Sequence, residues 1–245
     1  MSTEKEEIIG KTFINDKGLE FVIIDYINSQ DVTVKFDDHV VIYNVSYSAI
    51  KKGKVKNPYF KNLYGFGYCG RGIHKTSING KPTKKYRMWK AMLDRCYDDK
   101  VQKNRPTYIG CNVSESWNCY QVFGDWYEEN YNPETMQGWH LDKDILVKGN
   151  RVYSPETCCF VPNEINILFK TKFEQSENFK SGIRLTATLK YNLRCNTQHI
   201  GNFNTYEEAK LKCVIFRKQH IKKIADKWKH LITSTVYHAM INFEI

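Results

Sequence analysis

Residues 183–195 read IRLTATLKYNLRC, and this stretch decides the fold of the C-terminal quarter of the chain. Alternate residues are apolar, beginning at Ile183 and ending at Cys195, and the residues between them are polar. Successive side chains of a β-strand point to opposite faces, so the alternation predicts one face for a core and one for solvent or a ligand. We expect two strands joined by a three-residue hairpin loop, Thr188-Leu189-Lys190.

A third strand and a long helix are expected to complete this region. Residues 198–203 have strand character, and Thr205 and Glu208 then stand at the spacing of a capping box, which marks a helix N-terminus. The apolar side of this helix, predicted to end near Trp228 or Leu231, carries Ala209, Cys213, Phe216, Ile221, Ile224 and Trp228. The sequence therefore predicts three strands packed on one long helix.

Two helices are expected in the middle of the chain. Residues 86–96 place apolar side chains at helical spacing, and residues 117–131 form a second, aromatic-rich pattern of the same kind. We expect the two helices to pack on each other. The basic flank of the first helix is a candidate DNA contact and consists of Lys84, Lys85, Arg87, Lys90 and Arg95.

The N-terminal part has the composition of a small β module, residues 1–57. Residues 21–27, 32–36 and 40–45 are rich in β-branched and aromatic side chains and are separated by turn signals. Its net charge is close to zero, so a structural role or a protein partner is the default expectation. Residues 58–83 are expected to form a basic, Gly-rich linker. The whole chain is predicted to be an α+β protein.

The charge of the chain limits its classes of partner. The formal net charge is +10, and residues 171–245 carry 13 basic and 6 acidic side chains. This excess favours a polyanionic partner, of which nucleic acid is the commonest. No stretch reaches the roughly 18 apolar residues of a membrane span, and the acidic start lacks the apolar region of a signal peptide. A membrane role is therefore disfavoured, and a cytoplasmic location is expected.

Cysteine spacing and one strand bear on metal chemistry. None of the eight cysteines forms a C-x-x-C pair, so structural zinc is disfavoured.

In a strand through residues 140–144, His140, Asp142 and Asp144 would share one face and Lys143 would point the other way. Carboxylates beside an imidazole suit Mg²⁺ or Mn²⁺, which could then sit against a scissile phosphate. An ordinary charged surface hairpin is the alternative.

A helix predicted after this hairpin could complete such a site. Asn163 is expected to cap its N-terminus, and Asn166 on the helix could be brought back toward Asp142. The metal would then be held between a strand and a helix.

Two segments resemble known families. Residues 89 to about 169 resemble phage-encoded, homing-endonuclease-like proteins of the HNH type, and the segment after residue 178 resembles the Apetala-type (ERF-like) DNA-binding domain. The first resemblance is carried by Trp89, Met92, Arg95-Cys96, Tyr108, Trp117, Phe123, Trp126, Leu141-Asp142-Lys143-Asp144, Tyr153-Ser154-Pro155-Glu156-Thr157-Cys158, Phe160-Val161-Pro162 and Asn166. The second is carried by Ser181-Gly182-Ile183-Arg184, Tyr191-Asn192-Leu193-Arg194 and residues 199–209.

The HNH resemblance implies a ββα-metal domain over residues 84–172 and assigns roles in it. Asp142 takes the place of the first metal ligand and Asn166 that of the second. Lys143 stands where that family has its general-base histidine, and Thr157 stands near its orienting asparagine. A lysine is ordinarily protonated, so either His140 or a Lys143 of lowered pKa would serve as the base, or the nuclease would be inactive. The candidate catalytic residues are therefore His140, Lys143 and Asp144.

The Apetala resemblance implies a DNA-binding domain over residues 178–232 whose polar sheet face enters the major groove. The implied contacts are Arg184, Thr186, Lys190 and Arg194. Two functions follow as hypotheses: a metal-dependent endonuclease that cleaves duplex DNA, or a DNA-binding regulator or host-interference protein that kept an inactive HNH scaffold. A phage origin would place either one in the cytoplasm of the bacterial host. A protein-interaction role of the N-terminal module is the third hypothesis.

Overall fold

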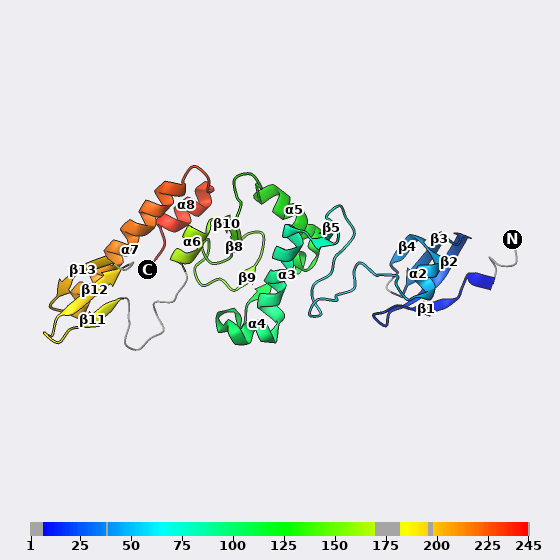
Figure 1. Cartoon of the computed structure of the whole chain (residues 1–245), viewed down its shortest axis with the longest axis horizontal. Helices are drawn as coiled ribbons and strands as arrows, with labels where there is room; N and C mark the ends of the chain where they lie inside the picture. The colour runs from blue at the N-terminus through cyan, green and yellow to red at the C-terminus, as the bar shows by residue number, and fades with distance from the viewer. Residues whose placement is uncertain (1–6, 38, 170–181, 196–197, 245) are drawn as a thin grey trace. The chain divides into compact units, whose positions relative to one another are not determined.

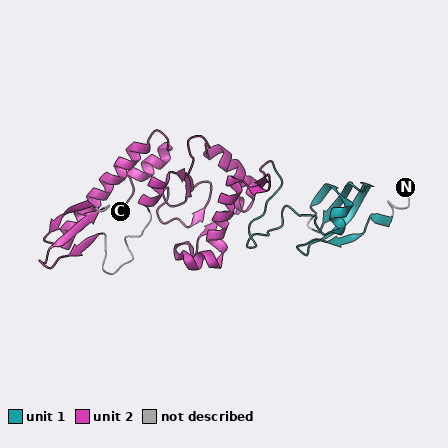
Figure 2. Cartoon of the chain, viewed as in Figure 1, with its two compact units in different colours: residues 1–72 teal, residues 73–245 magenta. Residues whose placement is uncertain are grey.

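The computed structural model describes residues 7–37, 39–169, 182–195 and 198–244, and it confirms the predicted α+β class. The chain divides into two compact units, Met1–Gly72 and Ile73–Ile245 (Figures 1 and 2). The predicted domain edges at residues 172 and 178, and Ser181 of the Apetala-like segment, lie outside the described residues. Among the described residues, no helix is both long enough and apolar enough to cross a membrane.

The first unit is built on a four-stranded antiparallel sheet with the strand order β1-β2-β3-β4. The strands are β1 (Thr12–Ile14), β2 (Glu20–Asn28), β3 (Asp31–Phe36) and β4 (Val41–Val45), and a short helix α2 (Tyr47–Lys51) follows. Val32, Val34 and Phe36 alternate along β3 and are buried in the core of the unit. The three expected strands are confirmed, whereas β1 and α2 were not predicted. Ser46 caps α2 by accepting a hydrogen bond from the N–H of Ala49.

The predicted Gly-rich linker, residues 58–83, is not one continuous connector. Residues 73–83 belong to the second unit, where β5 (Ser77–Ile78) and β6 (Lys81–Pro82) form a small hairpin. Its turn residues, Asn79 and Gly80, have φ values of +49° and +73°, the left-handed conformation that a tight two-residue hairpin turn requires.

The central part of the second unit is held by aromatic packing between α3 (Lys84–Tyr97) and α5 (Tyr120–Asn130). Both predicted helices are confirmed, but Trp117 lies in a preceding 3₁₀ turn, η2 (Glu115–Asn118). The indole of Trp89 donates a 2.7 Å hydrogen bond to the carbonyl of Trp117. The remaining short elements here are α4 (Asp99–Asn104), η1 (Pro106–Tyr108), and β7 (Asn112–Val113), which pairs in parallel with β9 (Val152–Tyr153).

A two-stranded antiparallel sheet and a helix follow. The strands are β8 (His140–Asp142) and β10 (Cys159–Val161), and the helix is α6 (Asn163–Leu168). The strand before this loop, the strand after it and the helix that follows were all expected from the sequence. The predicted N-cap at Asn163 is wrong: Pro162 occupies that position without a side-chain hydrogen bond, and Asn163 is already helical.

The C-terminal part contains the three-stranded antiparallel sheet and long helix that were expected. The elements are β11 (Ile183–Leu185), β12 (Tyr191–Cys195), β13 (Gln198–Phe203), α7 (Tyr206–Trp228) and α8 (Ser234–Ile241). The capping box is confirmed: the Thr205 hydroxyl accepts from the N–H of Glu208, and the Glu208 carboxylate accepts from the N–H of Thr205. The core between sheet and helix includes Leu193, Ala209 and Cys213.

The hairpin loop and part of the predicted core face differ from expectation. Thr186 and Lys190 are hydrogen-bonded across the hairpin, so the loop is residues 187–189 and lies one residue earlier than predicted. Leu185 and Leu189 were expected in the core but are 53% and 76% exposed. Leu185 ends an edge strand beyond the residues that α7 covers, and Leu189 lies in the loop itself with a φ of +55°.

Candidate functional site

The carboxylate of Asp142 organises the loop that follows β8. Its Oδ1 accepts hydrogen bonds from the backbone N–H groups of Asp144, at 2.8 Å, and Ile145, at 2.9 Å. Burial raises the pKa of Asp142, and these two hydrogen bonds oppose that rise because they favour the ionised form. One oxygen of the implied first metal ligand is therefore already engaged in ending the strand.

Lys143 is held inside this loop. Its side chain is 8% exposed, and Nζ donates hydrogen bonds of 2.6 Å to Oδ1 of Asp144 and to the carbonyl of Asn150. The side-chain amide of Asn150 donates back to the carbonyl of Lys143 at 2.8 Å, and Nζ lies 5.9 Å from the ring centroid of Tyr153. These contacts tie the two sides of the loop together.

The predicted shared face of His140, Asp142 and Asp144 is only partly present. Strand β8 ends at Asp142, so the alternation of side chains stops there and Asp144 lies in the turn, paired with Lys143. His140 begins β8, opposite Val161 of β10, and its side chain is exposed. The geometry thus separates Asp144 and Lys143, which brace the loop, from His140, which faces solvent.

Asn166 lies on α6, which packs against β8 and α7. Helix α6 buries Ile165, while Asn166 is half-buried. Glu164 of the same helix accepts 2.7 Å hydrogen bonds from Nζ of Lys227 and from the indole of Trp228, and these bonds lower the pKa of Glu164. These two bonds tie α6 to the end of α7.

A metal at this place would have few protein ligands. Asp142 and Asn166 would hold it through oxygen atoms, as Mg²⁺ and Mn²⁺ prefer, and water would complete the shell. Within the described residues, no group of three or more His, Cys, Asp or Glu side chains is placed to hold a metal ion. The donor set is of the right chemical kind for a hard cation, but one Asp142 oxygen is shared with the loop.

The basic flank predicted on α3 is engaged within the protein. Lys85 forms an ion pair with Glu128, and Lys90 forms one with Asp94 at 2.8 Å. Nη1 of Arg95 donates a 3.2 Å hydrogen bond to the hydroxyl of Tyr153. These contacts engage the three side chains within the protein, and the expected contact of this flank with DNA stays a prediction. Lys84, which donates to the Tyr131 hydroxyl, is engaged in the same way.

His74 forms a polar cluster that the sequence did not reveal. Its Nδ1 lies 2.7 Å from Nζ of Lys85, and its Nε2 lies 2.8 Å from Oδ1 of Asp125. An ammonium can only donate, so Nδ1 accepts and Nε2 carries the proton that Asp125 accepts. The side chain of Gln121 bonds both the N–H and the carbonyl of His74. With a side chain only 7% exposed, His74 anchors the start of this unit on α5.

The C-terminal sheet presents a polar face on the side away from α7. Arg184 of β11 pairs with Asn192 of β12, which pairs with Asn202 of β13. The Asn192 amide donates a 2.8 Å hydrogen bond to Oδ1 of Asn202. Arg194 pairs with His199 in the next row, and both side chains are exposed. A β-bulge between Leu193 and Arg194 separates the two rows.

The other two predicted DNA contacts lie at the hairpin loop. The hydroxyl of Thr186 donates to the carbonyl of Lys190 at 2.9 Å and accepts from its N–H at 3.2 Å. Thr186 therefore closes the loop, and the exposed side chain of Lys190 stands at its edge. The two arginines lie on the sheet, so the four predicted residues form one end and one face of the hairpin.

A comparison with protein-family models, with curated proteins and with solved structures finds no match to this chain.

Proposed function

We propose that this chain is a duplex-DNA-binding protein whose C-terminal sheet enters the major groove. The observation that carries the proposal is the exposed polar face of β11–β13, with Arg184 and Arg194 on neighbouring strands and the Asn192–Asn202 pair beside them. The opposite face is covered by α7, so the sheet has one face for packing and one for recognition.

The chemistry of this face matches the edges of base pairs. A β-ribbon fits the major groove, where arginine can pair with guanine O6 and N7 and asparagine with adenine N6 and N7. Residues 171–245 carry more basic than acidic side chains, and this excess attracts the chain to the phosphates of DNA independently of the base sequence. The resemblance to Apetala-type domains points to the same face.

Fluorescence anisotropy with labelled duplex DNA at low ionic strength tests this proposal. The double variant Arg184→Ala/Arg194→Ala removes two cations from the sheet face. The matched control Lys103→Ala/Arg105→Ala removes two exposed cations from the α4 region of the same unit. We expect tight binding by the wild-type chain and the control, and a loss of about tenfold or more in the sheet variant. Equal affinities of all three proteins would refute the assignment to this face.

A second candidate function is metal-dependent cleavage of the bound DNA. It is favoured by the order β8, loop, β10, α6 and by the exposed His140, which is the remaining candidate for the base. A divalent cation would supply charge stabilisation at the scissile phosphate. His140 would take the proton of the attacking water, while Asp142 and Asn166 would hold the cation.

Plasmid nicking separates the enzyme from the binder. Supercoiled plasmid is incubated with Mg²⁺ or Mn²⁺, or with a chelator, beside the variants Asp142→Asn and His140→Ala. Metal-dependent nicking that both variants lose would establish the nuclease. Retarded migration without nicks would support a DNA-binding protein that kept the scaffold alone. The ion pair of the buried Lys143 with Asp144 favours this outcome.

A further inference from the structure

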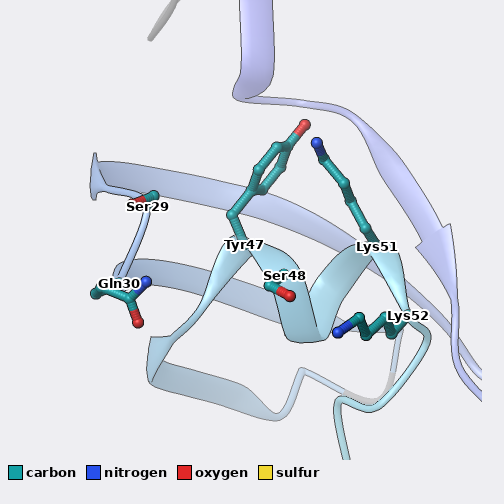
Figure 3. A pocket seen from close by; sticks show the side chains of 6 residues that line it. All are labelled: Ser29, Gln30, Tyr47, Ser48, Lys51 and Lys52. Atoms are coloured by element: carbon teal, nitrogen blue, oxygen red, sulfur yellow. The ribbon is translucent and has the colours of Figure 1, made fainter.

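The N-terminal unit contains a cavity of about 340 Å³ between the β2–β3 turn and α2. It is lined by Ser29, Gln30, Tyr47, Ser48, Lys51 and Lys52. Figure 3 shows Ser29 and Gln30 on one side, Lys51 and Lys52 on the other, and Ser48 between them. The volume lies at the lower end of the roughly 300–1,000 Å³ that small-molecule sites occupy.

The two walls of this cavity are fixed to each other. The N–H of Tyr47 donates a 2.8 Å hydrogen bond to the carbonyl of Ser29, which joins α2 to the turn. Oδ1 of Asn28 accepts from the N–H of Gln30 at 2.8 Å and holds the turn itself. The ring of Tyr47 packs edge-on against Tyr26, with centroids 6.0 Å apart. The backbone of the two walls is therefore fixed before any ligand binds.

Every polar side chain of the lining can donate a hydrogen bond. The lining has three hydroxyls, one carboxamide and two ammonium groups, and it contains no carboxylate. Among the described residues of this unit, the side chains of Ser29, Gln30, Ser48 and Lys52 form no hydrogen bond or ion pair with one another or with other described residues. Nζ of Lys51 lies 4.7 Å from the ring centroid of Tyr47, beside the hydroxyl (Figure 3).

The stretch that carries the two lysines is basic, whereas Asp31 directly follows Gln30 on the opposite wall. From His39 to Gly72 there is no aspartate or glutamate, whereas the same stretch contains five lysines and one arginine. Hydrogen-bond donors that line one cavity together with two ammonium groups fit an anion with several acceptor oxygens. A neutral or cationic ligand would leave both lysines unpaired.

We propose that this cavity is a binding site for a phosphate group. The two ammonium groups would balance the charge of the anion, and the hydroxyls and the Gln30 amide would donate to its oxygens. The phosphate can come from a free phosphorylated small molecule or from a nucleic-acid backbone. The site lies in the first unit and does not depend on the proposed function of the C-terminal sheet.

Amide chemical-shift mapping of the full-length chain with inorganic phosphate, in phosphate-free buffer, tests the site. The double variant Lys51→Met/Lys52→Met removes both ammonium groups, and Lys54→Met/Lys56→Met is the matched control from exposed positions of the same stretch. We expect saturable shifts at the lining residues, an affinity about tenfold or more weaker in the first variant, and an unchanged affinity in the control. Spectra of the β2–β3 residues verify that each variant is folded. Should the first variant fail to fold, Ser48→Ala is expected to weaken binding with its sheet signals unchanged.

The proposal is overturned if phosphate causes no saturable shift at the lining, or if both double variants weaken binding equally. Titrations with adenosine monophosphate and with duplex DNA then distinguish the two sources of phosphate. The duplex titration uses the Arg184→Ala/Arg194→Ala background, so DNA binding by the sheet does not obscure the result. That variant is also expected to bind inorganic phosphate as well as the wild type does, and a failure of the DNA proposal would leave the phosphate titration unchanged.

Discussion

Nζ of Lys143 lies 2.6 Å from Oδ1 of Asp144, so two neighbouring side chains form an ion pair inside the loop between β8 and β9. The same Nζ donates a 2.6 Å hydrogen bond to the carbonyl of Asn150, so both hydrogen bonds of this side chain lie within the loop. The position that the HNH resemblance assigns to a base is therefore used to brace the loop. Lys143 therefore has a structural role in this loop, and a base for DNA cleavage would have to be another residue.

The variant Lys143→Met tests the bracing role. Methionine retains much of the volume but cannot donate, so the carbonyl of Asn150 loses its partner and Asp144 loses its ion pair. We expect the free energy of unfolding to fall by about 1–3 kcal/mol, measured by urea denaturation. The exposed Lys103→Met serves as the control and should stay within about 0.5 kcal/mol of the wild type. Unchanged stability together with loss of DNA cleavage would instead assign Lys143 to catalysis.

Two variants of Asp142 separate its charge from its hydrogen bonds. Asp142→Asn keeps an oxygen that can accept from the N–H groups of Asp144 and Ile145, whereas Asp142→Ala removes it. We expect the alanine variant to lose about 1 kcal/mol of stability, as at a helix cap. The asparagine variant should equal or exceed the wild type at neutral pH, because a buried charge has been removed.

The pH dependence of stability follows from the raised pKa of Asp142. The unfolded chain releases the proton near the ordinary value of 3.8, and the folded chain releases it at higher pH. This group therefore lowers stability as the pH rises between those two values and contributes a constant penalty above them. Urea denaturation at pH values across this range should show this fall in stability for the wild type and should not show it for Asp142→Asn. An identical pH profile in both proteins would contradict the burial of this charge.

Gly124 makes room for His74. A Cβ atom at Gly124 would lie 2.2 Å from Cδ2 of His74, closer than side chains can approach. We expect Gly124→Ala to displace the imidazole and to cost about 1–3 kcal/mol of unfolding free energy. The double variant His74→Ala/Gly124→Ala should recover part of that loss, because the clash is gone. Strictly additive effects of the two single variants would show that His74 does not occupy this space.

The sequence predicted the parts of the fold that depend on local signals. Thr205 and Glu208 form their capping box because both partners lie within one helical turn. The β-branched and aromatic composition of residues 32–36, between turn signals, placed β3 correctly. The lengths of the strands and the exposure of single side chains were less predictable. Leu185 has the pattern of a core residue but ends an edge strand beyond the helix that would cover it.

The candidate site was predicted less well for two reasons. Some of its contacts join residues that are far apart in the sequence, and in other places single hydrogen bonds determine where a strand ends. Strand β8 ends at Asp142, whose carboxylate accepts hydrogen bonds from two backbone N–H groups. The alternation of residues in the sequence does not reveal these hydrogen bonds. His74 meets Asp125 across 51 residues, and the only local hint was a glycine, Gly124, inside a helix. Each such contact requires knowledge of the tertiary structure.

The most direct test of the central claim is amide chemical-shift mapping of the chain with duplex DNA at low ionic strength. The DNA-binding account predicts the largest shifts at the outward residues of β11–β13, with smaller ones at inward residues such as Leu193. Raising the salt concentration should weaken the binding, because phosphate contacts release counterions. Shifts confined to other parts of the chain, or the absence of any shift, would contradict the claim that this sheet reads DNA.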